Sequence, residues 1–119
     1  MLEINMEFRK GILFIRLIGE ITEKTASKLE SEVTELVEET GIHNLVFNLE
    51  GVTNIDIKGI NALLENYNIC KKNDGKTLVC NLDNSLVKHR IYNSRLLKYM
   101  YEASDEISAI NVLSLEGGI

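Results

Sequence analysis

The spacing of the apolar residues changes repeatedly along the chain, from alternate residues to a helical period and back, and this restricts the fold more than any other feature. Apolar and polar residues alternate over 2–8, which predicts a half-buried strand. An apolar run over 12–18, interrupted at Arg16, predicts a second strand, which we expect to end at Gly19. Lys10-Gly11 between the two runs predicts a tight turn, so the chain is expected to open with a β-hairpin.

Helices and strands then alternate. Apolar residues at helical spacing predict a helix over 23–40, with Thr22 as its N-cap and Gly41 just past its end. A second amphipathic helix is predicted to begin near Asp56. Buried strands are predicted at 45–49 and 76–80.

The last third of the chain gives weaker signals. We expect a short helix after an Asn84 cap, an edge strand over 99–101 and a final helix that Ser104 caps. The last four residues, 116–119, are expected to fray.

This order of elements predicts an α/β fold. A hairpin followed by βα units gives one mixed sheet of four or five strands with right-handed crossovers, and we expect the helices mainly on one face. A length of 119 residues fits a single domain over 1–119, with a core over about 2–115.

The charge and hydropathy of the chain exclude several classes of partner. The 13 basic and 18 acidic residues give a net charge of −5, which argues against nucleic acid as the main partner. No apolar stretch approaches the ~20 residues that span a bilayer, and no signal peptide is visible. We therefore expect a cytoplasmic protein without a membrane partner. Most of the acidic excess lies in residues 1–57, largely on the helix predicted over 23–40.

Motifs of common active sites are absent from the sequence. Cys70 and Cys80 are expected to pack as small apolar residues, and no CxxC pair occurs. His43 and His89 lie far apart without companions at ligand spacing, so a zinc site has no support. Phosphate-binding, nucleophile-elbow and metalloprotease motifs are also missing. We expect a protein that is not an enzyme and that uses no cofactor or metal.

The clearest functional signal is the loop that joins the strand at 45–49 to the second helix, where open α/β sheets place functional residues. Residues 55–60, Ile-Asp-Ile-Lys-Gly-Ile, resemble the Asp-Ser-Ser-Gly-Leu signature of the STAS domains, in particular of the bacterial anti-sigma factor antagonists. Residues 16–21 resemble the strand end before the first helix of that family, and 46–52 its central strand. The resemblance extends from residue 2 to about residue 115.

The resemblance implies a regulatory binding function. In that family an unphosphorylated antagonist binds an anti-sigma factor that is also a serine kinase, and the sigma factor is released for transcription. The kinase then phosphorylates the second hydroxyl residue of the signature, and a charge of about −1.5 to −2 separates the complex. Lys58 stands at that position and Ile57 before it, so the resemblance implies an antagonist without the usual phosphoswitch. Thr22 replaces an aspartate that is common in the family.

Two interpretations of Lys58 stay open, neutral drift at an exposed position and contact with an acidic patch of a partner. A cation in the first turn opposes the helix dipole at a cost of roughly 0.3–1 kcal/mol, which an Asp56 cap offsets in part. Because the apolar stripe of the helix begins at Ile60, we expect the Lys58 ammonium in solvent. Gly59 is expected to let the helix pack closely on the sheet.

The partner surface is expected along the rim formed by the ends of three strands. The candidate partner-binding residues are Glu20, Thr22, Glu23, Thr25, Thr53, Asn54, Asp56, Ile57, Lys58, Asn61, Asn81 and Asp83. The hydroxyls of Thr53, Ser85 and Ser94 are other possible phosphate acceptors, although capping or turn formation is the favoured interpretation of each. Two alternatives to the antagonist stay open: a scaffolding STAS domain that binds other STAS-pathway proteins, and a weak nucleotide-binding STAS protein, for which no phosphate loop is present.

Overall fold

The computed structural model describes residues 1–115, so the fraying predicted for 116–119 lies outside the described residues. One sheet has the strand order β1-β2-β3-β4-β5. β1 is antiparallel to β2, and each later neighbouring pair is parallel, so the sheet is mixed as predicted. The strands are β1 (Leu2–Arg9), β2 (Ile12–Ile21), β3 (Asn44–Ile55), β4 (Thr77–Cys80) and β5 (Tyr101–Ala103).

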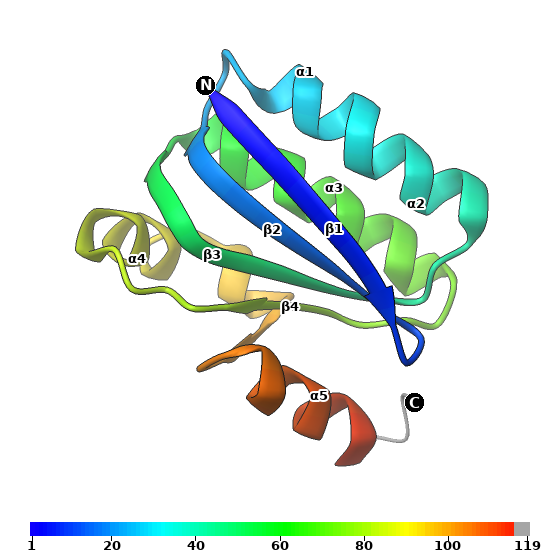
Figure 1. Cartoon of the computed structure of the whole chain (residues 1–119). Coiled ribbons are helices and arrows are strands. Elements are labelled where there is room, and N and C mark those ends of the chain that lie inside the picture. Colours follow the sequence, from blue (N-terminus) through cyan, green and yellow to red (C-terminus); the bar gives the residue numbers. More distant parts are fainter. Residues whose placement is uncertain (116–119) are drawn as a thin grey trace.

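Most of the helical residues cover one face of this sheet (Figure 1). On that face lie α1 (Ala26–Leu29), the π-helical turn η1 (Glu30–Thr34), α2 (Glu35–Thr40), α3 (Ile57–Lys72), α4 (Ser85–Tyr92) and the 3-10 turn η2 (Leu96–Lys98). The opposite face is covered by α5 (Glu106–Leu115), where Ala109 and Leu113 pack against Phe14 and Leu78. The α/β fold with helices mainly on one face is confirmed.

The period-two pattern of the strands produces these two cores. Leu13 and Ile15 on β2 point into the larger core with α1 to α4, while Phe14 between them belongs to the smaller core under α5. The side chains of all three are buried. The consecutive apolar residues 12–15 therefore mark the part of β2 that is covered on both faces.

The helix predicted over 23–40 begins later than expected, at Ala26. Thr22 is not its cap, because residues 22–25 form a turn in which the Thr22 N–H donates to Thr25 Oγ1 at 2.9 Å. The same helix is interrupted by the π-helical turn η1, which no residue pattern in the sequence predicts. Gly41 follows its last residue in the left-handed conformation, with φ 67°, as expected.

The final helix also differs from its prediction at the N-terminal end. Asp105, not Ser104, caps α5, because Asp105 Oδ1 accepts a hydrogen bond from the Ser108 N–H at 2.8 Å. Ser104 lies one residue earlier, and its hydroxyl pairs with that of Ser108. The edge strand expected over 99–101 lies at Tyr101–Ala103.

The two central strands are longer than their apolar runs and carry the functional edge of the sheet. β2 continues to Ile21 and β3 to Ile55, and these two residues are paired across the sheet. Register shifts between Arg16 and Ile18 and between Gly19 and Glu20 accommodate the additional pairing. As a result the loops before α1 and α3 leave the sheet side by side. Within residues 1–115, no helix is both long and apolar enough to cross a membrane.

Candidate functional site

The carboxyl ends of β2 and β3 bring the loop before α1 against the first turn of α3. The Asp56 N–H donates to the Ile21 carbonyl at 3.2 Å, directly beyond the last paired residues of the two strands. The end of β4 leads into residues 81–84 at the same edge, because β4 is parallel to β3. The structure therefore places the three predicted segments on one rim.

Asp56 connects two of these segments through one carboxylate. Its Oδ1 accepts from the Gly59 N–H at 2.8 Å, which makes it the N-cap of α3 as predicted. Its Oδ2 accepts from the Glu23 N–H at 2.9 Å in the loop before α1. Burial by itself raises the pKa of this carboxyl, but the N–H groups of Glu23, Gly59 and Lys58 outweigh that effect and hold the pKa below its ordinary value.

Replacing this carboxylate is expected to weaken the fold in a pH-dependent way. We expect Asp56→Ala to lower the free energy of unfolding by about 1–2 kcal/mol at neutral pH, since a capping bond and an interloop bond are lost. Because the folded pKa is lowered, the stabilisation is present above the unfolded pKa and disappears as the pH falls through the folded pKa. Urea denaturation at neutral and acidic pH measures this, and a difference between the two proteins that is constant with pH would contradict it.

Gly59 lets the first turn of α3 lie directly on the end of β2. A Cβ atom at this position would stand 2.0 Å from the Ile21 carbonyl oxygen and 2.7 Å from its carbonyl carbon. The expectation that Gly59 serves close packing is confirmed. The same contact fixes the position of the first two residues of α3, Ile57 and Lys58, relative to the end of β2.

Ile57 and Lys58 are presented to solvent at the start of α3. The Ile57 residue is 72% exposed. Lys58 is exposed, and no carboxylate of residues 1–115 lies within 4.0 Å of its ammonium. The expectation of a solvated Lys58 ammonium is confirmed.

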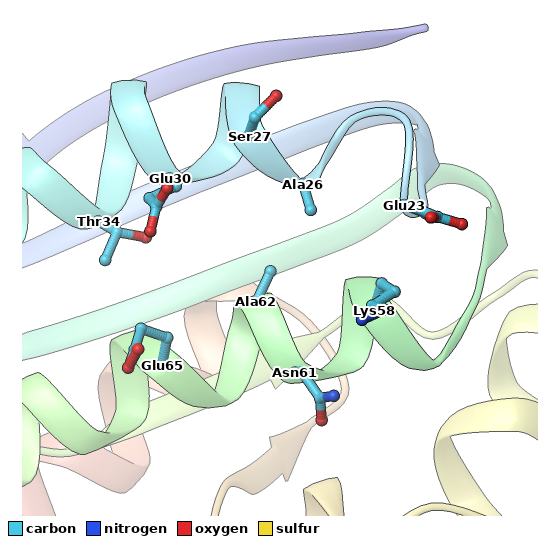
Figure 2. A pocket seen from close by; sticks show the side chains of 9 residues that line it. All are labelled: Glu23, Ala26, Ser27, Glu30, Thr34, Lys58, Asn61, Ala62 and Glu65. Atoms are coloured by element: carbon cyan, nitrogen blue, oxygen red, sulfur yellow. The ribbon is translucent and has the colours of Figure 1, made fainter.

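Lys58 faces an acidic groove between the α1–η1 segment and α3 (Figure 2). The groove has a volume of about 380 Å³, and its acidic side chains are Glu23, Glu30 and Glu65. Asn61 lines it as well, one helical turn after Lys58. Glu30 and Glu65 were not among the predicted site residues. Both lie on the polar side of a helix, and the sequence does not indicate which other element lies opposite that side.

Thr25 differs from the other candidates because it is buried, with 8% of the residue exposed. Its hydroxyl donates to the Glu20 carbonyl at 2.8 Å and accepts from the Thr22 N–H at 2.9 Å. Thr25 thus shapes the loop from inside, whereas Glu20 and Glu23 are exposed on the rim.

The remaining candidates occupy the other parts of the rim. Thr53 is exposed on β3, and Asn54 accepts a hydrogen bond from Arg90 of α4, which also donates to the Ile55 carbonyl at 2.8 Å. Asn81 has a left-handed backbone with φ 58°, and Asp83 after it is exposed. Arg90 was not among the predicted site residues, and its two bonds hold the end of β3.

Of the other hydroxyls that were considered as phosphate acceptors, that of Ser94 has a local role. Ser94 donates to the Ile91 carbonyl at 2.7 Å and accepts from the Leu96 N–H at 3.1 Å, which stabilises the turn between α4 and η2. Ser85 is the first residue of α4, whose cap is Asn84, as predicted.

The two cysteines lie in α3 and β4, and the two histidines lie before β3 and in α4. Cys70 and Cys80 are buried, as expected, and burial raises the pKa of their thiols to about 11 and about 12. At those values both thiols stay protonated at neutral pH. His43 and His89 are exposed.

Comparison with known proteins gives consistent matches over nearly the whole chain. The model of the STAS domain family matches residues 3–109. The anti-sigma F factor antagonist of Paenibacillus polymyxa is 26% identical over 115 residues, which cover 96% of this chain and 97% of that protein.

Solved structures show the same fold at lower identity. A protein described as a candidate anti-sigma factor antagonist from Thermotoga maritima superposes with a TM-score of 0.86 at 12% identity, covering 93% of this chain and 94% of that one. The Bacillus cell fate determinant SpoIIAA in its phosphorylated form superposes with a TM-score of 0.70 at 18% identity, covering 92% and 99%.

Proposed function

Because this chain belongs to the STAS domain family, we propose that it is an anti-sigma factor antagonist that binds an anti-sigma factor of the serine kinase type without a serine phosphoswitch. Through that binding it regulates transcription by the sigma factor that the partner holds. The relative from Paenibacillus polymyxa, which is matched over 97% of its length, carries the antagonist function in its name and supports this role.

The observation that carries the proposal is the first turn of α3. Asp56 caps this turn, Gly59 seats it on β2, and residue 58 is thereby held out in solvent at the edge of the rim. In the family pattern a hydroxyl stands at this position, and here it is an ammonium. Lys58 has no oxygen to accept a phosphoryl group, and its charge of +1 differs by about three units from that of a phosphoserine.

The proposed partner surface consists of the exposed residues of the rim. Glu20 and Glu23 supply exposed negative charge on the rim, while Thr25 acts from inside by holding the loop. Protein interfaces typically have an apolar core that is surrounded by a polar rim. We propose that Ile57 is the apolar anchor of that contact.

The test is to mix the protein with candidate anti-sigma kinases, with and without ATP. Gel filtration follows the complex, and intact mass spectrometry follows the modification of the chain. We expect a complex whose amount does not depend on ATP and a chain whose mass does not change.

Each other outcome would overturn part of the proposal. A stoichiometric gain of roughly 80 Da with release of the partner would show that the switch has moved to another hydroxyl, such as Thr53, Ser85 or Ser94. Absence of a complex with any such kinase would overturn the partner class. Copurification with other STAS proteins in place of a kinase would establish the scaffolding role.

A further inference from the structure

A second groove lies on the opposite side of the first turns of α3 from Lys58, between α3 and the α4–η2 segment. Its volume is about 940 Å³, more than twice that of the acidic groove. Ile57, Ile60 and Leu64, spaced at helical intervals on α3, form an apolar wall of this groove. Lines of apolar residues that reach the surface without a covering element indicate a binding surface.

The other wall of this groove is basic. Arg95 and Lys98 are exposed along it, and no carboxylate of residues 1–115 lies within 4.0 Å of either cation. The neighbouring Arg90 is committed to Asn54 and to the Ile55 carbonyl. The Arg95 guanidinium lies over the Tyr99 ring and donates to its hydroxyl at 3.4 Å, and neither contact neutralises its charge. Arg95 and Lys98 therefore lack a carboxylate partner among the described residues and can pair with a ligand carboxylate.

One carboxylate lines the groove, and it does not neutralise these cations. Both oxygens of Asp56 accept backbone N–H bonds, from Gly59 and from Glu23. With Arg90, Arg95 and Lys98 against Asp56, the groove carries a net positive charge. The two sides of α3 thus carry grooves of opposite sign.

We infer that the groove between α3 and α4 binds an acidic peptide segment with an aliphatic anchor. The anchor would cover Ile57, Ile60 and Leu64, and the flanking carboxylates would pair with Arg95 and Lys98. The acidic groove beside Lys58 repels the same segment, so the charges direct it to one side of α3.

The arrangement of polar groups favours an extended segment over a small anion. The side chains of residues 1–115 that hold a buried polar atom without a partner are Asn66, Thr77 and Asn81, and none of them lines this groove. The cations of this groove, Arg90, Arg95 and Lys98, are spread along the segment from α4 to η2. A site for a single anionic group needs converging polar donors, whereas a segment with several carboxylates matches cations that are spread out.

This inference goes beyond the proposed function, because it requires neither an anti-sigma factor nor residue 58. The test uses a fluorescein-labelled peptide of alternating aspartate and glutamate residues around a central leucine pair. Fluorescence polarisation at low salt measures its affinity for the full chain. A peptide with alanines in place of the leucines and a peptide with lysines in place of the acids serve as ligand controls.

Matched charge reversals locate the site. We expect the double variant Arg95→Glu, Lys98→Glu to weaken binding at least about tenfold, because each reversal replaces an attraction by a repulsion. The control variant Lys72→Glu, Lys88→Glu changes the net charge equally at exposed positions outside the groove and should bind within about twofold of the original. Ile57→Ser should weaken the leucine peptide about tenfold and the alanine peptide little.

Several results would overturn the inference. Equal weakening by the two double variants would mean general attraction of an acidic peptide to positive charge. Equal affinity of the leucine and alanine peptides would remove the apolar anchor. Binding of dodecyl phosphate that Arg95→Glu, Lys98→Glu abolishes, without binding of the peptide, would assign the groove to a small amphiphile. Unchanged thermal unfolding of each variant establishes that the fold is intact.

Discussion

Gly59→Ala is expected to destabilise the protein by about 3 kcal/mol, although alanine is the better helix former. The added methyl group would stand 2.0 Å from the Ile21 carbonyl oxygen, far inside the contact distance of real Cβ atoms. Both nearest atoms belong to the backbone, so no side-chain rotation relieves the clash. Ile21 cannot retreat either, because it pairs with Ile55 in the sheet and accepts from the Asp56 N–H.

Relief must therefore come from a displacement of α3 itself. That displacement would stretch the bonds from Asp56 to Gly59 and Glu23, which hold the rim together. We expect Gly59→Ala to lower binding at the rim as well as stability, since the same displacement moves Ile57 and Lys58.

Guanidinium denaturation compares this variant with Gly41→Ala as a matched control. Gly41 has no atom within 4 Å of an added Cβ but has a φ of 67°, so its replacement should cost about 1 kcal/mol from backbone strain alone. A Gly59→Ala protein as stable as the original would show that helix propensity outweighs the contact with Ile21, and would contradict the close packing.

Features that depend on neighbouring residues were predictable from the sequence. The Asp56 cap, the start of α3 and the solvated Lys58 all follow from a short polar residue before an apolar helical stripe. The hairpin and the mixed sheet follow from the change of apolar spacing. For the cap and the start of α3, residue pattern is sufficient because the bonds connect residues three or four positions apart. The strands of the sheet pair over longer distances, but the apolar spacing identifies each strand by itself and the usual connection rules then place them side by side.

Features that depend on distant pairing were not predictable in the same way. Arg16 donates to both carboxylate oxygens of Glu106, at 2.9 and 2.8 Å, and so ties α5 to the outer face of the sheet. These residues are 90 positions apart, and either could equally have been a solvated surface charge. This bond is the first cause of the lowered pKa of Glu106. The covering of the second face by α5 is missed for the same reason.

The grooves on the two sides of α3 belong to this second class. Their walls come from α1 and from α4, and a sequence pattern does not say which helix surfaces meet. The signal that existed was the separation of charge between the two parts of the chain. It indicated an acidic surface on the helix over 23–40, and the fold was needed to place grooves beside one helix terminus.

Lys58→Ser is expected to create a phosphoswitch in a protein that, under the proposed function, lacks one. The new hydroxyl would lie in the first turn of α3, in solvent and within the proposed partner surface. A helix N-terminus stabilises a phosphate through its free N–H groups, so the modified residue would be tolerated by the fold. The charge at position 58 would change from about +1 in the original protein to about −2 in the phosphorylated variant.

That change occurs beside Glu23, Glu30 and Glu65, so phosphate would add to an already negative groove. With a kinase that forms a complex with the original protein, we expect ATP to add roughly 80 Da to Lys58→Ser and to weaken its complex at least about tenfold. Lys58→Ala serves as the control, because it removes the charge without adding a hydroxyl, and its complex should remain insensitive to ATP. A kinase that binds Lys58→Ser but leaves its mass unchanged would show that residue 58 lies outside the reach of the catalytic site, and the proposed correspondence with the family's serine would be wrong.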